Sequence, residues 1–327
     1  MPTQRAPRRR GAAATAAAVT VALLAAGCSS SASASASASA SASARVGAKG
    51  GGPTITVVGA ENEYANVIAQ IGGKYVRTDA VMSDPNTDPH TFEASPAVTQ
   101  EVSSAQLVVQ NGVGYDTFMD DIEKAAPSSS RTVIDVQKLL GLPDSTVNPH
   151  LWYRSGTMPA VAEAVAADLS RLQPADADYF QANLTAFDHS LSAWTTAVAA
   201  LKAAHPDTPV ATTEPVADYL LQAAGTDNLT PWSLQADIMN GVDPSPQDVT
   251  FQEQLFTQHK VQLFLYNQQV TDALTQTFLA LAKQDGIPVV GVYETMPTDG
   301  YDYQSWMLAE VDAIDRALSS GQSTEKL

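Results

Sequence analysis

Residues 54–82, TITVVGAENEYANVIAQIGGKYVRTDAVM, contain the pattern that decides the fold. The run at 54–60 is apolar and rich in β-branched residues, which is typical of a buried strand. Apolar residues then recur at helical spacing until Gly72 and Gly73 end the helix. A second strand is expected at 75–82. The order strand, helix, strand with short connections predicts a parallel sheet flanked by helices.

The same alternation continues along the chain in two halves. In the first half, further strands are expected at 106–110 and 132–136, and helices at 95–104, 116–126 and 159–172. In the second half, strands are expected at 208–213, 229–233, 261–266 and 286–293, and helices at 216–224, 249–259 and 272–284. We therefore predict an α/β fold with two lobes, each with a mostly parallel sheet flanked by helices.

A long helix is expected between the two halves, at residues 174–204. Its apolar residues recur in steps of four and three and form one stripe, which consists of Phe180, Leu184, Phe187, Leu191, Trp194, Val198 and Leu201. The stripe suits either a coiled-coil partner or, as we favour, packing along the same protein. The predicted domains are an N-terminal lobe at 53–173, one long rigid linking helix at 174–204 and a C-terminal lobe at 205–327. A continuous helix favours small tilts of the lobes over a wide hinge closure.

The first 52 residues belong to neither lobe. Basic residues are followed by an apolar run at 11–27 and then by Cys28, the only cysteine, which is the pattern of an export signal. Residues 25–28, AAGC, resemble a lipoprotein cleavage box, although Ala25 replaces the larger aliphatic residue that is commoner there. We predict a lipoprotein signal peptide at 1–27, lipidation of Cys28 and a Ser/Ala-rich flexible tether at 28–52.

The charge balance narrows the class of partner. Six of the 18 basic residues lie in the first 52 positions and all 35 acidic residues follow them, so the remainder has a net charge near −23. Such a charge excludes nucleic acid as a partner and is compatible with collecting cations, although a solvated acidic surface accounts for most of these carboxylates. A single cysteine excludes a disulfide framework and a multi-thiolate metal site.

Two loops carry a Pro-His pair. TDPHTFEASP at 87–96 contains His90, and NPHLW at 148–152 contains His150. Either pair alone is an ordinary loop feature, but both are expected beyond the carboxyl ends of first-lobe strands, where ligands bind in such sheets. In the second half, Glu214 and Glu294 follow strands in the same manner.

Two imidazoles and two carboxylates form a ligand set that suits Zn²⁺ or Mn²⁺. Tetrahedral closure would favour zinc, and a bidentate carboxylate that raises the coordination number would favour manganese. Binding requires neutral histidines, so the affinity should fall as the pH drops through about 6.5.

Four motifs together resemble a known family: DPHTFEASP at 88–96, NG at 111–112, NPHLW at 148–152 and VATTEPVADYLLQAAG at 210–225. They are similar to the cluster A-I solute-binding lipoproteins of zinc and manganese ABC importers, over about residues 54–315. The resemblance implies one metal ion between two lobes that are joined by a long helix.

Matching the motifs places the metal ligands at His90, His150 and Glu214. The third ligand is His in many zinc-type members and Glu in many manganese-type ones. The fourth is expected after the last strand, at Glu294, with Asp299 as the reserve. This chain has no His-rich loop between the first two ligands, which departs from many zinc binders.

Other polar residues have weaker signals. Glu61, after the first strand, is interpreted either as a hydrogen-bond partner of a ligand or as an exposed loop acid. Asn111 is expected to shape a turn with Gly112. The remaining histidines, His189, His205 and His259, are expected on the surface or at helix ends.

The resemblance implies a monomeric extracytoplasmic receptor, anchored to the outer face of the membrane, that delivers Zn²⁺ or Mn²⁺ to an ABC permease. It would not be an enzyme. The alternatives are a metal-dependent hydrolase and a surface adhesin. A catalytic zinc site keeps a position open for water, and the sequence contains no HExxH, Gly-x-Ser-x-Gly or phosphate-loop motif.

Overall fold

The computed structural model describes residues 54–85, 87, 92, 95–297 and 300–327. The expected signal peptide and tether, with Cys28, lie outside the described residues. So do two residues of the predicted metal site, His90 and the reserve ligand Asp299.

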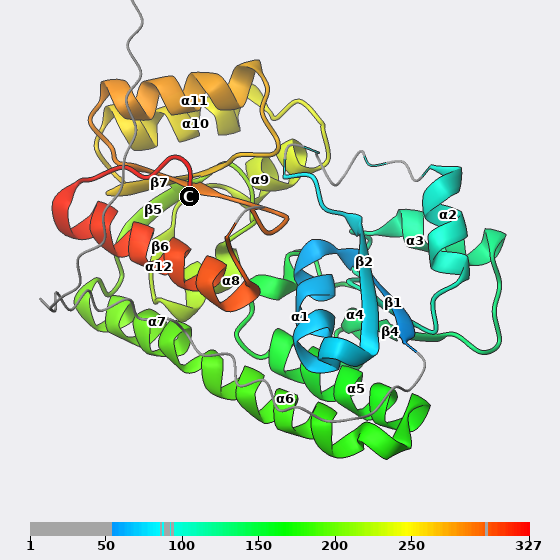
Figure 1. The fold of residues 1–327 in the computed structure, drawn as a ribbon. Helices are drawn as coiled ribbons and strands as arrows, with labels where there is room; N and C mark the ends of the chain where they lie inside the picture. Colours follow the sequence, from blue (N-terminus) through cyan, green and yellow to red (C-terminus); the bar gives the residue numbers. More distant parts are fainter. Residues whose placement is uncertain (1–53, 86, 88–91, 93–94, 298–299) are drawn as a thin grey trace, which may run out of the picture. The chain divides into compact units, whose positions relative to one another are not determined.

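The first lobe contains a four-stranded parallel sheet in the order β2-β1-β3-β4. Its strands are β1 (Ile55–Glu61), β2 (Val76–Met82), β3 (Leu107–Gln110) and β4 (Thr132–Asp135). Its helices are α1 (Asn62–Gly72), α2 (Pro96–Ser103), α3 (Thr117–Ala125), the short α4 (Val136–Leu139) and α5 (Thr157–Leu172). The predicted order of strands and helices in this lobe is confirmed, except for the short α4, which the sequence did not predict (Figure 1).

Both faces of the first sheet are covered, which explains why β1 is apolar without alternation. Val57 packs into the cluster that includes α1 and α5, whereas its neighbour Val58 packs into a second cluster with α2 and α3. Successive side chains of a strand point to opposite faces, so each face obtains its own core.

The second lobe repeats this arrangement with the order β6-β5-β7-β8, again parallel. Its strands are β5 (Pro209–Thr212), β6 (Asp227–Asn228), β7 (Leu263–Asn267) and β8 (Val289–Val292). Its helices are α8 (Asp218–Ala223), α9 (Trp232–Met239), α10 (Pro246–Thr257), α11 (Ala273–Gln284) and α12 (Tyr303–Ser320). The predicted fold of two α/β lobes is therefore confirmed.

The strand expected at 229–233 is wrong. The strand is the two-residue β6, and α9 begins at Trp232 directly after Pro231. Proline is well tolerated at the start of a helix, and Leu234 and Ile238 are buried at helical spacing. The apolar run was too short to separate a strand from a helix by its period.

The linking segment follows the expected path but bends. A single 3₁₀ turn (Pro174–Asp176) leads into α6 (Ala177–Ser190), and α7 (Ser192–Ala204) follows after an interruption at Leu191. The hydroxyl of Ser190 donates to the carbonyl of Phe187 (2.6 Å) and accepts from Nε2 of Gln304 on α12 (2.6 Å). A serine that bonds back to its own helix while packing against a neighbour favours such a bend.

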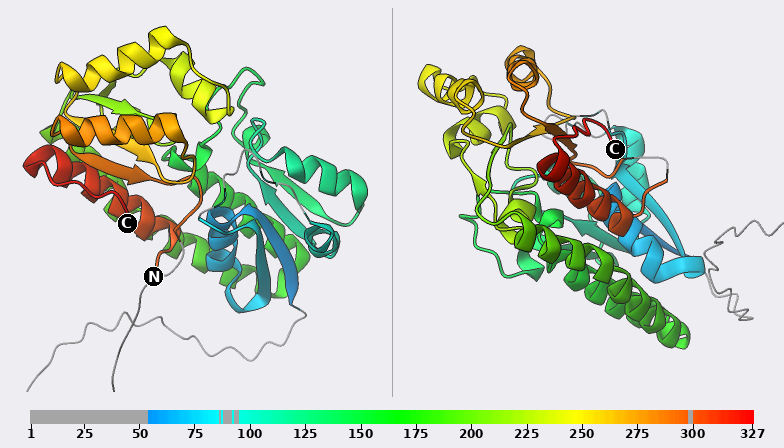
Figure 2. Two further views of the ribbon diagram at one scale, coloured as in Figure 1. Left: turned by 90° about the horizontal axis from the view of Figure 1, so that it is seen from above. Right: turned by 90° about the vertical axis from the view of Figure 1, so that its left-hand side faces the viewer.

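The apolar stripe of this segment packs along the same chain, as favoured. Six of its seven residues are buried: Phe180, Leu184, Phe187, Leu191, Trp194 and Leu201. α6 contacts α1 and α5 of the first lobe, and α7 contacts α8 and α12 of the second. The right-hand view of Figure 2 shows α6 and α7 as one long green segment.

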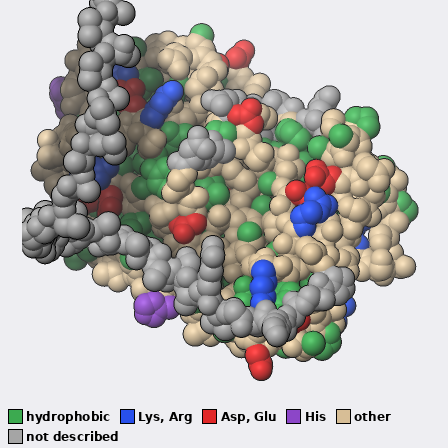
Figure 3. All heavy atoms as spheres, viewed as in Figure 1, with side chains coloured by type: hydrophobic (Ala, Val, Ile, Leu, Met, Phe, Trp, Pro, Cys, Tyr) green, Lys and Arg blue, Asp and Glu red, His purple; other side chains and the backbone are tan. Residues whose placement is uncertain are grey.

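The described surface carries no concentrated charge on the face drawn in Figure 3, where Lys, Arg, Asp and Glu side chains are scattered among polar and apolar ones. None of the helices in the described part of the chain is both long and apolar enough to cross a membrane.

Candidate metal centre

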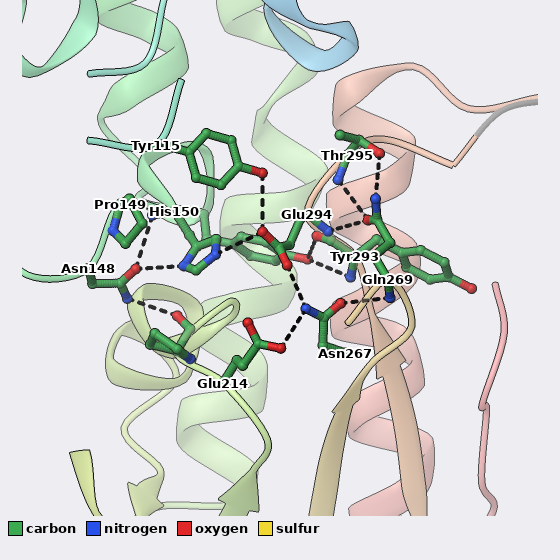
Figure 4. A network of polar contacts seen from close by, with 12 residues as sticks. Tyr115, Asn148, Pro149, His150, Glu214, Asn267, Gln269, Tyr293, Glu294 and Thr295 are labelled. Atoms are coloured by element: carbon green, nitrogen blue, oxygen red, sulfur yellow. Dashed lines mark hydrogen bonds and ion pairs between the residues drawn. The ribbon is translucent and has the colours of Figure 1, made fainter. Parts of the chain in front are cut away.

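Three of the predicted ligands lie where a loop of the first lobe faces strand ends of the second lobe (Figure 4). His150 precedes a 3₁₀ turn (Leu151–Tyr153) in the first lobe, and in the second lobe Glu214 and Glu294 each lie two residues beyond a strand. All three are buried, with exposures of 0%, 2% and 0%. Sequence reasoning predicted this placement from the rule that ligands gather at the carboxyl ends of parallel strands.

The imidazole of His150 is held in one tautomer. Its Nδ1 lies 2.8 Å from Oδ1 of Asn148, and the same oxygen accepts the backbone N–H of His150 at 3.0 Å. A backbone N–H can only donate, so the atom of Asn148 is an oxygen and Nδ1 of the ring carries the proton. In the neutral ring Nε2 then carries the lone pair, and this atom lies 3.4 Å from Oε2 of Glu294. This is the tautomer that a histidine needs to bind a metal ion through Nε2.

Asn148 also connects the two lobes. Its Nδ2 donates to the carbonyl of Pro215 at 2.8 Å, and Pro215 directly follows Glu214. The backbone carbonyl of Asn148 accepts from the hydroxyl of Tyr219 at 3.0 Å. The sequence showed Asn148 only as part of a motif. A side-chain oxygen that bonds two residues onward is common for Asn before proline, but the contact with the second lobe had no local signal.

Glu294 is contacted by both lobes. Its Oε2 accepts from the hydroxyl of Tyr115 at 3.2 Å, and its Oε1 accepts from Nδ2 of Asn267 at 2.6 Å. Burial, together with the nearby carboxylate of Glu294, raises the pKa of Tyr115 well above its usual value, so the phenol remains a donor. The Tyr115 ring also packs edge-on against His150, with ring centroids 5.8 Å apart.

Two amides that sequence reasoning missed organise the second-lobe side. Nδ2 of Asn267, the last residue of β7, donates to Oε1 of Glu214 at 3.0 Å as well as to Glu294. Oε1 of Gln269 accepts the backbone N–H groups of Glu294 (2.6 Å) and Thr295 (2.9 Å). The only sequence signal was a polar residue that closes an otherwise apolar strand, at the edge where ligands gather.

His90 lies outside the described residues, but Thr87, close to it in the sequence, joins this network. Nε2 of Gln269 donates to the carbonyl of Thr87, three residues before His90, at 3.1 Å. Within the described residues, no three His, Cys, Asp or Glu side chains form a closed metal site. What the structure brings together is His150 with Glu294, and Glu294 with Glu214 through Asn267.

Asn111 does more than shape a turn. Its Nδ2 donates to the carbonyl of Pro149 at 2.8 Å, and its Oδ1 accepts from the hydroxyl of Tyr64 at 2.6 Å. It therefore supports the backbone just before His150. The backbone N–H groups of Asn111 and Gly112 are in turn accepted by the carboxylate of Asp116.

Glu61 is fully buried, so the interpretation as an exposed loop acid is wrong. Its carboxylate has no hydrogen-bond partner among the described residues, and neither has that of Glu63, which is also buried. Burial raises the pKa of Glu61 well above its usual value, and the charges of Asp116 and Glu63 add to this effect. Burial likewise raises the pKa of Glu63 to about 8. Sequence reasoning did not single out Glu63.

The other histidines lie outside this network. His189 and His259 are exposed, and Nε2 of His205 lies 3.2 Å from Oγ of Ser319 on α12. Their expected role as surface residues or residues near helix ends agrees with these positions.

Comparison with known proteins identifies the family. The sequence model described as "Zinc-uptake complex component A periplasmic" matches residues 57–317. The chain belongs to this family. Among curated relatives, the manganese-binding lipoprotein MntA of Bacillus subtilis is 26% identical over 143 residues, which are 42% of this chain and 46% of that protein. The lipoprotein FimA of Streptococcus parasanguinis is 23% identical, with 83% and 92% of the two chains covered.

Solved structures of other proteins share the fold of this family member. The periplasmic zinc-binding protein TroA of Treponema pallidum has a TM-score of 0.70 at 19% identity, with 82% of this chain and 99% of TroA covered. A crystal structure of ZnuA has a TM-score of 0.66 at 20% identity, with 80% and 98% covered. The alignments with the first two curated relatives span only about half of each, 46% and 50%. The structural likeness extends over both lobes.

Proposed function

We propose that this protein is an extracytoplasmic solute-binding protein that captures Zn²⁺ or Mn²⁺ between its two lobes and passes it to an ABC import permease. The observation that carries the proposal is the buried contact of His150, oriented to offer Nε2, with Glu294 of the opposite lobe, which Asn267 joins to Glu214. Membership of the zinc-uptake family supports it, as do relatives named for manganese and zinc binding.

The proposed ligands are His90, His150, Glu214 and Glu294, with Asp299 in reserve. Two carboxylates that share one amide donor and are almost fully buried repel each other and lose their hydration. A divalent cation offsets both costs at once. Imidazole and carboxylate serve zinc and manganese alike, so the donor types admit both ions.

The buried position favours capture over catalysis. A hydrolytic metal site needs an open position for water and a base beside it. Here Glu294 is engaged by Tyr115, His150 and Asn267, all within the interior. A surface adhesin, the other alternative, has no need for such a buried set of polar groups.

We propose that a lipid at Cys28 and the tether at 28–52 hold a monomeric protein at the outer face of the membrane, close to the permease. Release of the ion requires the lobes to separate. The separation would be small, because α6 packs on the first lobe and α7, which follows it, packs on the second. Separation would break interlobe contacts such as that between Tyr115 and Glu294.

The experiment is equilibrium dialysis of the purified protein against Zn²⁺ and Mn²⁺, separately and in competition, followed by elemental analysis. We expect a single tightly held ion per chain and no hydrolysis of ester or phosphoester substrates by the loaded protein. Failure to retain either ion in a folded sample would contradict the proposal, and metal-dependent hydrolysis would support the hydrolase instead.

Replacing Asn148 by alanine is expected to lower the affinity for the bound metal by about 10–100-fold. The variant loses the acceptor that keeps the proton on Nδ1 of His150 and the contact with Pro215. Titration against a chelator of known affinity measures the change. Asn240→Ala, at an exposed asparagine whose side chain bonds only within its own helix, is the control. Equal affinities of the two variants would show that Asn148 does not orient the ligand.

A further inference from the structure

Asn267 is the residue through which two proposed ligands are joined. It ends β7 and is completely buried. Its Oδ1 accepts the backbone N–H of Gln269 at 3.0 Å, which identifies that atom as the oxygen. The atom that faces the carboxylates is therefore the nitrogen Nδ2, and each of its two N–H groups donates to one carboxylate.

One oxygen of each carboxylate accepts a hydrogen bond from Asn267. Nδ2 donates to Oε1 of Glu214 at 3.0 Å and to Oε1 of Glu294 at 2.6 Å (Figure 4). Hydrogen bonds to a charged acceptor are about twice as strong as neutral ones. An oxygen that already accepts such a bond is a poorer donor to a metal ion, so both bonds oppose ligation through two oxygens of either carboxylate. The bond from Tyr115 to Oε2 of Glu294 is longer, at 3.2 Å, and leaves that oxygen the better metal donor.

The remaining contacts fix the direction of Glu294. Its Oε2 is the oxygen that faces Nε2 of His150 and accepts from Tyr115. Its backbone N–H is held by Oε1 of Gln269, so the main chain is not free to shift and bring the second oxygen forward. The carboxylate thus points one oxygen at the opposite lobe and the other at Asn267.

We propose that Asn267 determines metal specificity by restricting Glu214 and Glu294 to one ligand oxygen each. This inference rests on the proposed function. Single-oxygen ligation by both carboxylates keeps the coordination number low, which suits the tetrahedral preference of zinc, whereas manganese favours more oxygen ligands. The ligand types alone suit both ions, and Asn267 therefore shifts the preference of the site toward Zn²⁺.

The test compares Zn²⁺ and Mn²⁺ affinities of the full-length protein and its Asn267→Ala variant by chelator competition. Removal of both N–H donors frees each carboxylate to bind through two oxygens. We expect the ratio of the Mn²⁺ to the Zn²⁺ dissociation constant to fall by about 10-fold or more. X-ray absorption of the Mn²⁺-loaded variant should show a higher coordination number than the wild type.

A matched control exists in the same lobe. Nδ2 of Asn228 on β6 also donates to a carboxylate, Oδ1 of Asp218, at 3.0 Å, but this carboxylate is not a proposed ligand. Asn228→Ala should leave the Mn²⁺ to Zn²⁺ ratio unchanged. Asn267→Ser, which retains one O–H donor, should give an intermediate ratio and provides the measurement if Asn267→Ala does not fold.

The outcomes separate the two proposals. If the wild type binds metal and Asn267→Ala and Asn267→Ser keep its ratio and coordination number, the role of Asn267 is overturned while metal capture stands. If the folded wild type retains neither ion, metal capture itself is contradicted.

Discussion

Replacing His150 by alanine is expected to weaken Zn²⁺ binding by at least about 100-fold, because loss of a ligand exceeds the 10–100-fold cost of losing a supporting residue. The imidazole is buried and held with Nε2 toward Glu294, so no other side chain of this lobe is positioned to replace it among the described residues. Chelator competition or calorimetry on the purified protein measures the loss.

The control is His189→Ala, since His189 is exposed on α6 and takes no part in the network. It should bind Zn²⁺ as the wild type does. Thermal unfolding without metal shows whether His150→Ala is folded. If a folded His150→Ala protein bound Zn²⁺ with unchanged affinity, His150 would not be a ligand.

The second large effect concerns stability and pH. Burial raises the pKa of Glu63 to about 8 and that of Glu61 well above its usual value. In the unfolded chain both titrate near their usual pKa of 4.5, so between about pH 4.5 and pH 8 the folded state binds more protons than the unfolded chain. The contribution of the two protonated carboxyl groups to stability is complete below about pH 4.5 and is lost as the pH rises through about 8. The metal-free protein should therefore become less stable from pH 6 to pH 9.

Replacing Glu63 by glutamine should remove part of this dependence. Glutamine keeps the shape and carries no charge, so we expect the variant to exceed the wild type in stability by on the order of 3 kcal/mol at pH 9, with a smaller difference at pH 5. Denaturant unfolding at each pH, with a chelator present, measures both values. Asp121→Asn, at a carboxylate that is 84% exposed, should show no such trend. A pH profile of Glu63→Gln parallel to that of the wild type would contradict the assignment.

These buried acids lie beside a contact between the lobes. Asn62, between Glu61 and Glu63 at the start of α1, donates to the carbonyl of Met296 at 2.7 Å and accepts its backbone N–H at 2.9 Å. Met296 lies two residues after Glu294. Deprotonation of the pair therefore adds negative charge close to the proposed metal site and to one of the contacts between the lobes.

Much of this arrangement could be predicted from local sequence. Short apolar runs such as VQLFLY indicated buried strands, and the carboxyl ends of parallel strands gather at one edge of a sheet. That rule, together with the Pro-His loops and the resemblance to a known family, predicted that His150, Glu214 and Glu294 lie in one region. The Pro-His pair in NPHLW indicated a fixed loop. The hydrogen bond from the backbone N–H of His150 to the side chain of Asn148 is typical of such turns.

What could not be predicted depends on contacts between distant residues. Asn267 and Gln269 have no local pattern, and their roles arise only because they meet Glu214, Glu294 and Thr87 in the folded chain. The bend at Leu191 likewise involves Gln304, 114 residues beyond Ser190. The buried state of Glu61 opposes the usual exposure of carboxylates, and tertiary packing overrode that preference.

X-ray absorption of the Zn²⁺-loaded full-length protein tests the ligand set most directly. Four nitrogen or oxygen neighbours at about 2.0–2.2 Å are expected, with the outer-shell scattering of two imidazole rings in the wild type and of one in His150→Ala loaded at high Zn²⁺. A sulfur neighbour, a spectrum without imidazole scattering, or an identical spectrum for His150→Ala would contradict a site built from His90, His150, Glu214 and Glu294.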